Sequence, residues 1–230
     1  IYFLLLTGKV KDALKDEEFH CFLGVVGGAI LALFIIALPY YKQYGDCLRD
    51  AAFTVGTLIS TTGYATTDYN IWPPIAHSIV LFLMFVGACA GSTGGGFKQV
   101  RLVIMWKTLR RNIHKFLHPS EVRTIEYNDR PMSESIVSNI SSYVIAYVLI
   151  VIVSTIAISV DGFDFETNFS AVMATFNNIG PGLNVVGPAG NFAAFSLFSK
   201  VILILDMLAG RLEIMPILIL FSKTTWKKAR

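Results

Sequence analysis

Two short loops contain residue types that could bind an alkali cation through their backbone. Residues 61–67 read Thr-Thr-Gly-Tyr-Ala-Thr-Thr, and residues 178–182 read Asn-Ile-Gly-Pro-Gly. Backbone carbonyl groups can replace the water shell of a cation, hydroxyl groups can assist, and glycine permits the conformation that points carbonyls inward. We predict that these two loops line a path for a cation. The alternative is a pair of turns in interfacial loops.

The two loops belong to a duplicated pattern. Placing Gly63 on Gly180 aligns residues 59–64 with residues 176–181, and a two-residue shift then brings residues 90–92 onto residues 209–211. Each copy reads as an apolar span, a segment of about 15 residues that is too short to cross a bilayer, a loop, and a second span. The predicted spans are residues 19–41, 71–89, 139–160 and 192–209, and the short segments are residues 46–60 and 163–177. Helices in the short segments would direct the partial negative charge of their carboxyl ends at the loops.

The composition excludes an ordinary soluble domain. Hydrophobic residues make up 54% of the chain and charged residues 15%, whereas about a quarter of the residues in a soluble domain are charged. We therefore predict an all-α integral membrane fold made of tandem repeats of helix, pore helix, filter loop and helix. The predicted divisions are residues 1–8 as the end of a preceding transmembrane helix, 9–117 and 133–230 as the repeats, and 118–132 as their connection.

The charged residues predict an orientation. Basic residues gather in the connection between the repeats: Lys98, Arg101, Lys107, Arg110, Arg111, Lys115, Arg123 and Arg130. Such residues mark the cytoplasmic side, so we expect a multi-pass protein whose connection and C-terminus are cytoplasmic. The opposite face carries the acids Asp46, Asp50, Asp68, Asp161, Asp164 and Glu166. These acids either concentrate cations at the mouth of a path or, at Asp46 and Asp164, cap the short helices.

A glycine-rich segment interrupts the second span. Its residues are Gly91, Ser92, Thr93, Gly94, Gly95 and Gly96. A phosphate-binding loop would place lysine directly after the last glycine, whereas Phe97 stands between Gly96 and Lys98. We predict an intramembrane loop that obstructs or opens a path, and the alternative is that Ser92 and Thr93 only satisfy freed backbone groups.

Arg211 occupies the corresponding position of the second copy. An ionisable residue at membrane depth must face a cavity or a partner. Facing a cavity, Arg211 would place positive charge beside the glycine-rich loop; alternatively it forms a structural salt bridge with Asp206 or Glu213. No nucleophile, base and orienting group come together in the sequence, so we predict that the protein is not an enzyme.

Three stretches together resemble the Trk and Ktr potassium-uptake family, specifically its TrkH-like branch. They are residues 60–64 with Trp72 and Pro73, residues 89–96, and residues 177–183 with residues 210–214. The resemblance implies four repeats around one pore, of which this chain would hold the third and fourth. It also implies a gate formed by residues 91–96 with Arg211. By the same resemblance, potassium would be coordinated by the backbone of Thr61, Thr62, Gly63, Asn178, Ile179 and Gly180. Potassium would be the only ligand, without a covalent or organic cofactor.

The same resemblance implies partners and a location. It indicates a bacterial inner membrane protein in contact with lipid, a homodimer, and a cytosolic nucleotide-binding regulatory subunit of the RCK type, with no nucleic acid. The basic connection is the expected contact surface, although anionic lipid headgroups would explain its charge equally well. The alternatives are a coupled secondary transporter of a small solute, a sodium-permeable variant, and a membrane scaffold that conducts nothing.

Overall fold

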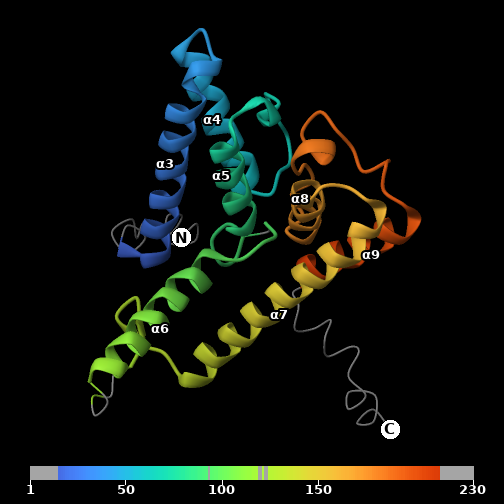
Figure 1. Cartoon of the computed structure of the whole chain (residues 1–230). Coiled ribbons are helices and arrows are strands. Elements are labelled where there is room, and N and C mark those ends of the chain that lie inside the picture. The colour runs from blue at the N-terminus through green and yellow to red at the C-terminus, as the bar shows by residue number, and fades with distance from the viewer. Residues whose placement is uncertain (1–14, 93, 119–120, 122–123, 213–230) are drawn as a thin grey trace.

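The described part of the chain is almost entirely helical (Figure 1). The computed structural model describes residues 15–92, 94–118, 121 and 124–212. The helices are α3 (Glu17–Ala37), α4 (Tyr44–Ile59), α5 (Pro74–Phe85), α6 (Gln99–Leu117), α7 (Glu134–Ile158), α8 (Phe165–Phe176) and α9 (Leu197–Arg211). Shorter elements are the 3₁₀ turns η1 (Leu38–Tyr40), η2 (Tyr69–Ile71), η3 (Ser159–Asp161) and η4 (Asn184–Val186), and the strands β1 (Glu126–Tyr127) and β2 (Arg130–Pro131).

The helices form two groups that follow the sequence. Helices α3, α4 and α5 pack on one another, and α7, α8 and α9 do the same. Contacts of α5 with α8 and of α6 with α7 join the groups (Figure 1). In each group a long helix is followed by a shorter helix, a loop and another helix.

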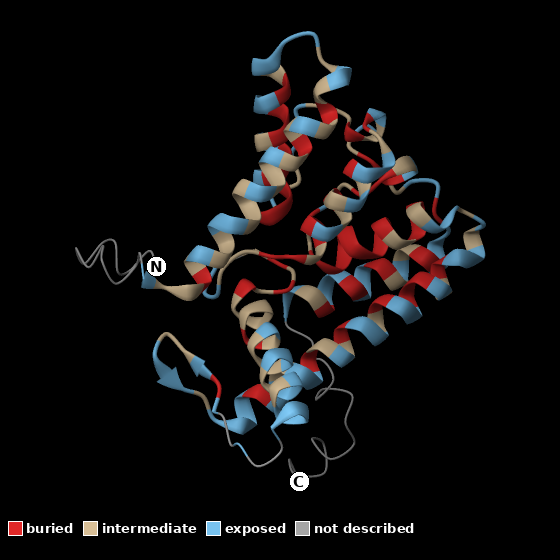
Figure 2. Cartoon of the chain, turned by 60° about the vertical axis from the view of Figure 1, so that its left-hand side comes forward, coloured by how far each residue is buried: buried red, intermediate tan, exposed pale blue. Residues whose placement is uncertain are grey.

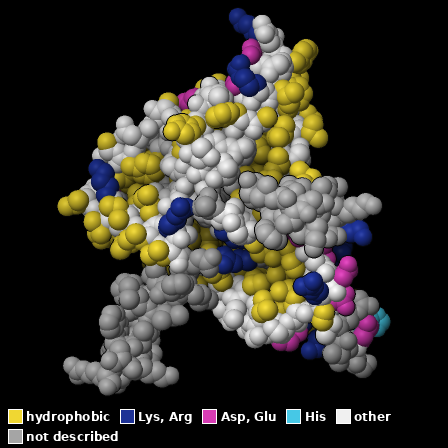
Figure 3. Space-filling model, turned by 180° about the vertical axis from the view of Figure 1, so that it is seen from behind, with side chains coloured by type: hydrophobic (Ala, Val, Ile, Leu, Met, Phe, Trp, Pro, Cys, Tyr) yellow, Lys and Arg dark blue, Asp and Glu magenta, His cyan; other side chains and the backbone are white. Residues whose placement is uncertain are grey.

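Two helices of the described part are long and apolar enough to cross a membrane. They run over Glu17–Tyr40 and Glu134–Asp161 and cover the predicted spans 19–41 and 139–160. Their outward faces are apolar, with Ile35 67% exposed on α3 and Ile156 68% exposed on α7. Hydrophobic side chains also spread widely over the face seen in Figure 3. Apolar surface on this scale is typical of contact with lipid or with another protein.

The prediction of one continuous span over residues 71–89 is wrong. Helix α5 covers only Pro74–Phe85, because the next residues leave the helix and pair with the strand-like segment before α6. The amide of Gly87 donates to Phe97 O at 2.9 Å, and the amide of Gln99 donates to Ala88 O at 3.3 Å. The break therefore begins before the glycine-rich loop. Helix α9 also begins later than predicted, at Leu197, since Ser196 caps it.

The all-α prediction misses one small hairpin. Strands β1 and β2 pair antiparallel around Asn128 and Asp129, whose φ angles of 50° and 59° are those of a type I′ turn. Asn128 Nδ2 donates to Asp16 Oδ2 at 2.9 Å, and the amide of Glu17 donates to Asn128 Oδ1 at 3.0 Å. These bonds attach the connection between the groups to the start of α3.

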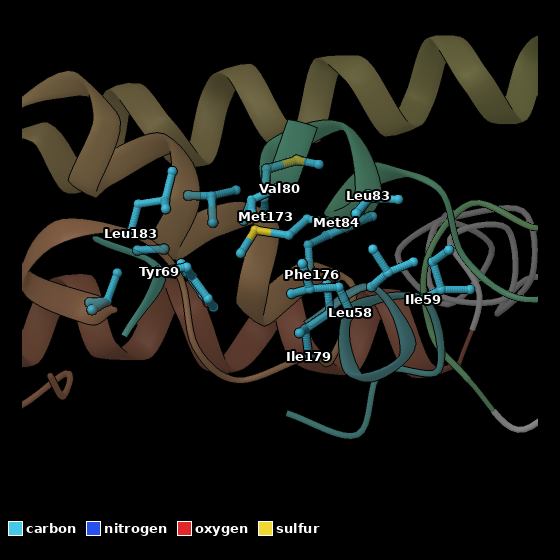
Figure 4. Packing of buried hydrophobic residues seen from close by; sticks show 14 of the residues in the cluster. Leu58, Ile59, Tyr69, Val80, Leu83, Met84, Met173, Phe176, Ile179 and Leu183 are labelled. Atoms are coloured by element: carbon cyan, nitrogen blue, oxygen red, sulfur yellow. The ribbon is translucent and has the colours of Figure 1, made fainter. Parts of the chain in front are cut away.

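One hydrophobic cluster underlies both groups. Leu58 of α4, Met84 of α5, and Met173 and Phe176 of α8 belong to it (Figure 4). Buried residues run along nearly all of α8 (Figure 2). The core therefore lies where the two short helices α4 and α8 end, and it fixes the loops that follow them.

Candidate functional site

Helices α4 and α8 end in the same way. In both, the chain closes with a Schellman motif, in which the amides of two successive residues donate back to carbonyls of the last turn. The bonds are Thr61 N to Leu58 O (3.2 Å), Thr62 N to Thr57 O (3.0 Å), Asn178 N to Thr175 O (3.0 Å) and Ile179 N to Ala174 O (2.8 Å). Donors and acceptors match position by position under the alignment that places Gly63 on Gly180.

The backbone of the two loops is also similar. Thr61 and Asn178 both have a φ of 55°, and Gly63 and Gly180 have φ values of 80° and 110°. A positive φ is unusual for threonine and is adopted by asparagine more readily. The carbonyl oxygens of residues 61–63 and 178–180 accept no hydrogen bond from any residue in the described ranges.

The two loops touch at a glycine. A Cβ atom placed on Gly63 would lie 2.2 Å from Ile179 O and 3.4 Å from Pro181 Cδ. Only glycine allows this approach, and its positive φ adds a second reason. The structure thus brings the first predicted loop against the second, although 116 residues separate Gly63 from Ile179 (179 − 63).

The glycine-rich loop lies against both predicted cation-binding loops. The amide of Gly95 donates to Thr61 Oγ1 at 3.2 Å. A Cβ atom on Gly95 would lie 2.1 Å from Asn177 O and 3.4 Å from Asn178 Cβ, so only glycine fits against the second loop at this position. The predicted gate residue Thr93 lies outside the described residues. The structure therefore joins Gly95 of the predicted gate to the two predicted cation-binding loops.

Arg211 and the glycine-rich loop line one cavity of about 240 Å³. Its other lining residues include Lys98, Arg101 and Gly210. Gly210 packs on the end of α8, since a Cβ atom there would lie 1.6 Å from Phe176 O. The Arg101 guanidinium stacks over the Tyr143 ring, 3.8 Å from its centroid. The cavity is rich in positive charge.

Asp206 bonds to a serine of α7. It is buried and accepts a hydrogen bond from Ser154 Oγ at 2.8 Å, and no ion pair joins it to Arg211. On a helix, residues five positions apart do not share a face, which explains the separation. The other predicted counter-ion, Glu213, lies outside the described residues.

Lys98 has a role that the sequence pattern does not indicate. Its ammonium donates to Ser92 O at 3.1 Å, to Ser92 Oγ at 3.2 Å and to Gly94 O at 2.5 Å. Lys98 therefore holds the glycine-rich loop closed on itself. The only hint in the sequence is a basic residue two positions after the last glycine.

Asp50 is a second residue that sequence reasoning placed only among the outer acids. It is 4% exposed on α4 and accepts from Thr66 Oγ1 at 3.0 Å and from Tyr41 Oη at 3.1 Å. Arg49 Nε also lies 3.0 Å from its carboxylate. Asp50 thus anchors the segment that follows the first loop through the side chain of Thr66.

The capping alternative holds for Asp164 and not for Asp46. Asp164 accepts from the amide of Thr167 at 3.2 Å and from Thr167 Oγ1 at 2.5 Å at the start of α8. The hydrogen bond from the Thr167 side chain lowers the pKa of the Asp164 carboxyl. The residue before α4 is Gln43, and Asp46 pairs instead with Arg49 at 3.0 Å.

Comparisons with known proteins agree with this arrangement. Residues 40–228 match the sequence model of the TrkH family, described as a cation transport protein. The Trk system potassium uptake protein TrkH of Salmonella typhimurium is 37% identical over 99% of this chain and 47% of its own length. TrkG of Escherichia coli, also named a Trk system potassium uptake protein, is 28% identical over the same shares.

A solved structure matches as well. The crystal structure of the potassium transporter TrkH from Vibrio parahaemolyticus aligns with a TM-score of 0.83 and 34% identity over 93% of this chain and 46% of that chain. The chain thus spans about half the length of the curated relatives it matches. The fold and the matches place the chain in a class of helical membrane proteins whose family model is described as a cation transport protein. The chain belongs to the TrkH family.

Proposed function

We propose that this chain forms half of a pathway for potassium uptake. Thr61, Thr62 and Gly63 coordinate the ion together with Asn178, Ile179 and Gly180, through peptide oxygens that replace water. The printed names of its relatives describe potassium uptake, which supports potassium as the cation.

The meeting of Gly63 with Ile179 O carries this proposal. It brings together two loops that both follow the carboxyl end of a short helix, where the helix dipole favours a cation. A site for an anionic substrate would instead use helix amino ends. The arrangement therefore favours a cation pathway over a transporter of anionic solutes.

The glycine-rich loop is the gate in this proposal. Its contacts with Thr61 and Asn177 support a position directly beside both cation-binding loops. Arg211 adds positive charge to the cavity that this loop lines. A cation leaving the loops would meet that charge, so movement of residues 91–96 would control passage.

The two helical groups are proposed as the third and fourth of four repeats of helix, pore helix, filter loop and helix. The shared helix endings and the coverage of 46% of the Vibrio transporter support this division. The chain would cross the bacterial inner membrane several times, with the connection after α6 and the C-terminus in the cytoplasm. The basic residues of α6 support that orientation.

The cytoplasmic side is also the proposed contact surface for partners. A groove of about 500 Å³ beside α6 is lined by Lys107, Arg110, Arg111 and His114 together with Glu126. Its charge suits an acidic surface, either of an RCK-type regulatory subunit or of anionic lipid. Family resemblance further supports a homodimer.

Rubidium and potassium uptake by a potassium-starved host tests the proposal. The protein is expressed at its full natural length, and the change is Gly63→Ser, whose side chain would collide with Ile179 O. Lost uptake or a changed ratio of rubidium to sodium is expected. Gly45→Ser is the control, because a Cβ atom on Gly45 has no neighbour within 4 Å. If Gly63→Ser takes up rubidium and sodium at the same rates as the parent, the proposal is contradicted. Sodium uptake by the parent would indicate a sodium-permeable variant.

A further inference from the structure

A side chain that follows the first cation-binding loop holds the backbone that follows the second. The amide of Asn184 donates to Asn70 Oδ1 at 2.9 Å, and Asn70 Nδ2 donates to Asn184 O at 3.2 Å. A Cβ atom on Gly187 would lie 2.1 Å from Asn70 Nδ2, so this glycine leaves room for the amide. The side-chain amide of Asn70 therefore binds both the backbone N–H and the backbone C=O of Asn184, as the backbone of a neighbouring strand would.

The residue before Asn70 makes a second contact of the same kind. Tyr69 is 1% exposed, and its Oη donates to Gly182 O at 3.0 Å. Gly182 stands two positions after Gly180, the central glycine of the second loop. The bond therefore acts close to the peptide oxygens that we assign to cation binding.

Acidic residues of α8 hold the same segment from its other side. Asn184 Nδ2 donates to Asp164 Oδ2 and to Glu166 Oε2, both at 3.0 Å. Glu166 Oε1 in turn lies 2.9 Å from His77 Nδ1, and His77 Nε2 lies 3.2 Å from Tyr69 O. Asn184 has a φ of 52°, a conformation that needs such support in a residue other than glycine. The backbone after the second loop is thus fixed between α8 and residues of the first helical group.

From these contacts we propose that Asn70 and Tyr69 are positioning residues for the second cation-binding loop, so that its ion preference depends on residues of the first helical group. The inference rests on the proposed function. Residues 178–183 belong to no helix or strand, so the side chains of Tyr69 and Asn70 add to the few backbone bonds that place their carbonyls. Selectivity between cations depends on where those carbonyls stand.

The test measures the ratio of rubidium to sodium uptake in a potassium-starved host that expresses the protein at its full natural length. Asn70→Ala removes both bonds to Asn184, and Tyr69→Phe removes only the bond to Gly182. We expect Asn70→Ala, which removes two bonds, to lower the ratio by about fivefold or more, since one net hydrogen bond changes an equilibrium by about fivefold. Tyr69→Phe should lower it in the same direction by less.

The controls are an asparagine and a tyrosine for which the described ranges show no hydrogen bond to the second loop. Asn191→Ala loses a local bond from the amide of Ala193, and Tyr40→Phe changes a side chain that is 53% exposed. Both should keep the parental ratio. A purely structural role would lower the uptake of both ions equally, together with the amount of protein in the membrane.

Two outcomes overturn the inference or the proposed function on which it rests. An unchanged ratio in both Asn70→Ala and Tyr69→Phe overturns the inference alone. If Asn70→Ala does not reach the membrane, the ratio in Tyr69→Phe decides. A parent protein that shows no preference for rubidium overturns the proposed function, and the inference with it.

Discussion

The amide of Gly95 donates a hydrogen bond to the hydroxyl of Thr61 over 3.2 Å. This bond joins a residue of the proposed gate to a residue of the first proposed cation-binding loop. In that proposal, opening the gate breaks the bond, so its strength contributes to the closed state.

Thr61→Val keeps the shape of the side chain and removes the acceptor for Gly95. We expect uptake of rubidium in the absence of any stimulus to rise about fivefold, because the closed loop loses about one net hydrogen bond. Tracer uptake, divided by the amount of protein in the membrane, measures the effect. Thr108→Val, which removes a bond within α6 to Ile104 O, is the control. Identical rates for both variants would show that the bond does not restrain the gate.

Lys98→Gln shortens the side chain and removes the ammonium that binds Ser92 and Gly94. The glycine-rich loop should then be less ordered and the resting flux higher, by more than in Thr61→Val since several charged hydrogen bonds are lost. Proteolysis or hydrogen exchange of residues 91–96 reports the order of the loop directly. Lys115→Gln near the end of α6 is the matched control. Equal protection of residues 91–96 from proteolysis or exchange in Lys98→Gln and Lys115→Gln would show that Lys98 does not order the loop.

Asp50 and Asp46 lie on the same helix, but substituting them should lower the free energy of unfolding by different amounts. Asp50→Ala removes a buried carboxylate that accepts hydrogen bonds from Thr66 and Tyr41, so the free energy of unfolding should fall by about 1–3 kcal/mol, as expected for hydrogen bonds to a charged group. Asp46 pairs with Arg49 at the surface, and its side chain is 48% exposed. Asp46→Ala should therefore change the free energy by no more than about 0.5 kcal/mol. Thermal unfolding in detergent measures the stability of both variants. Equal losses of stability would refute the anchoring role of Asp50.

Asp164 predicts a dependence of stability on pH. Its pKa is lower in the folded protein than the ordinary 3.8, so its contribution is complete above that value and is lost as the pH falls through the folded pKa. The amide side chain of the Asp164→Asn variant cannot ionise, so the variant should not lose this stability in acid. The difference in unfolding temperature between parent and variant is measured at neutral pH and below 3.8. A difference that does not shrink in acid would rule out a contribution from the ionised carboxylate.

Features that depend on neighbours in the chain could be predicted from the sequence. The apolar spans that became α3 and α7 were long enough to identify, and the short segments that became α4 and α8 were placed within two residues. The alignment of Gly63 with Gly180 also predicted a shared backbone form, because each helix end is closed by hydrogen bonds that reach only a few residues back.

The end of α5 could not be predicted in this way. Residues 86–89 are as apolar as the helix before them, and they leave it because Gly87 and Ala88 find backbone partners at Phe97 and Gln99. Hydropathy measures whether a segment tolerates lipid, and it does not measure whether an extended partner competes with the helix.

The sequence by itself determined that the chain is a membrane protein of the TrkH family with two matched loops, since composition and local motifs carry that information. Only the tertiary structure decided which groups meet: Gly63 with Ile179, Gly95 with Thr61, and Asn70 with Asn184. The physical reason is that these contacts join residues from 34 to more than a hundred positions apart. Their formation depends on how the helices pack around a common core, and no local pattern records that packing.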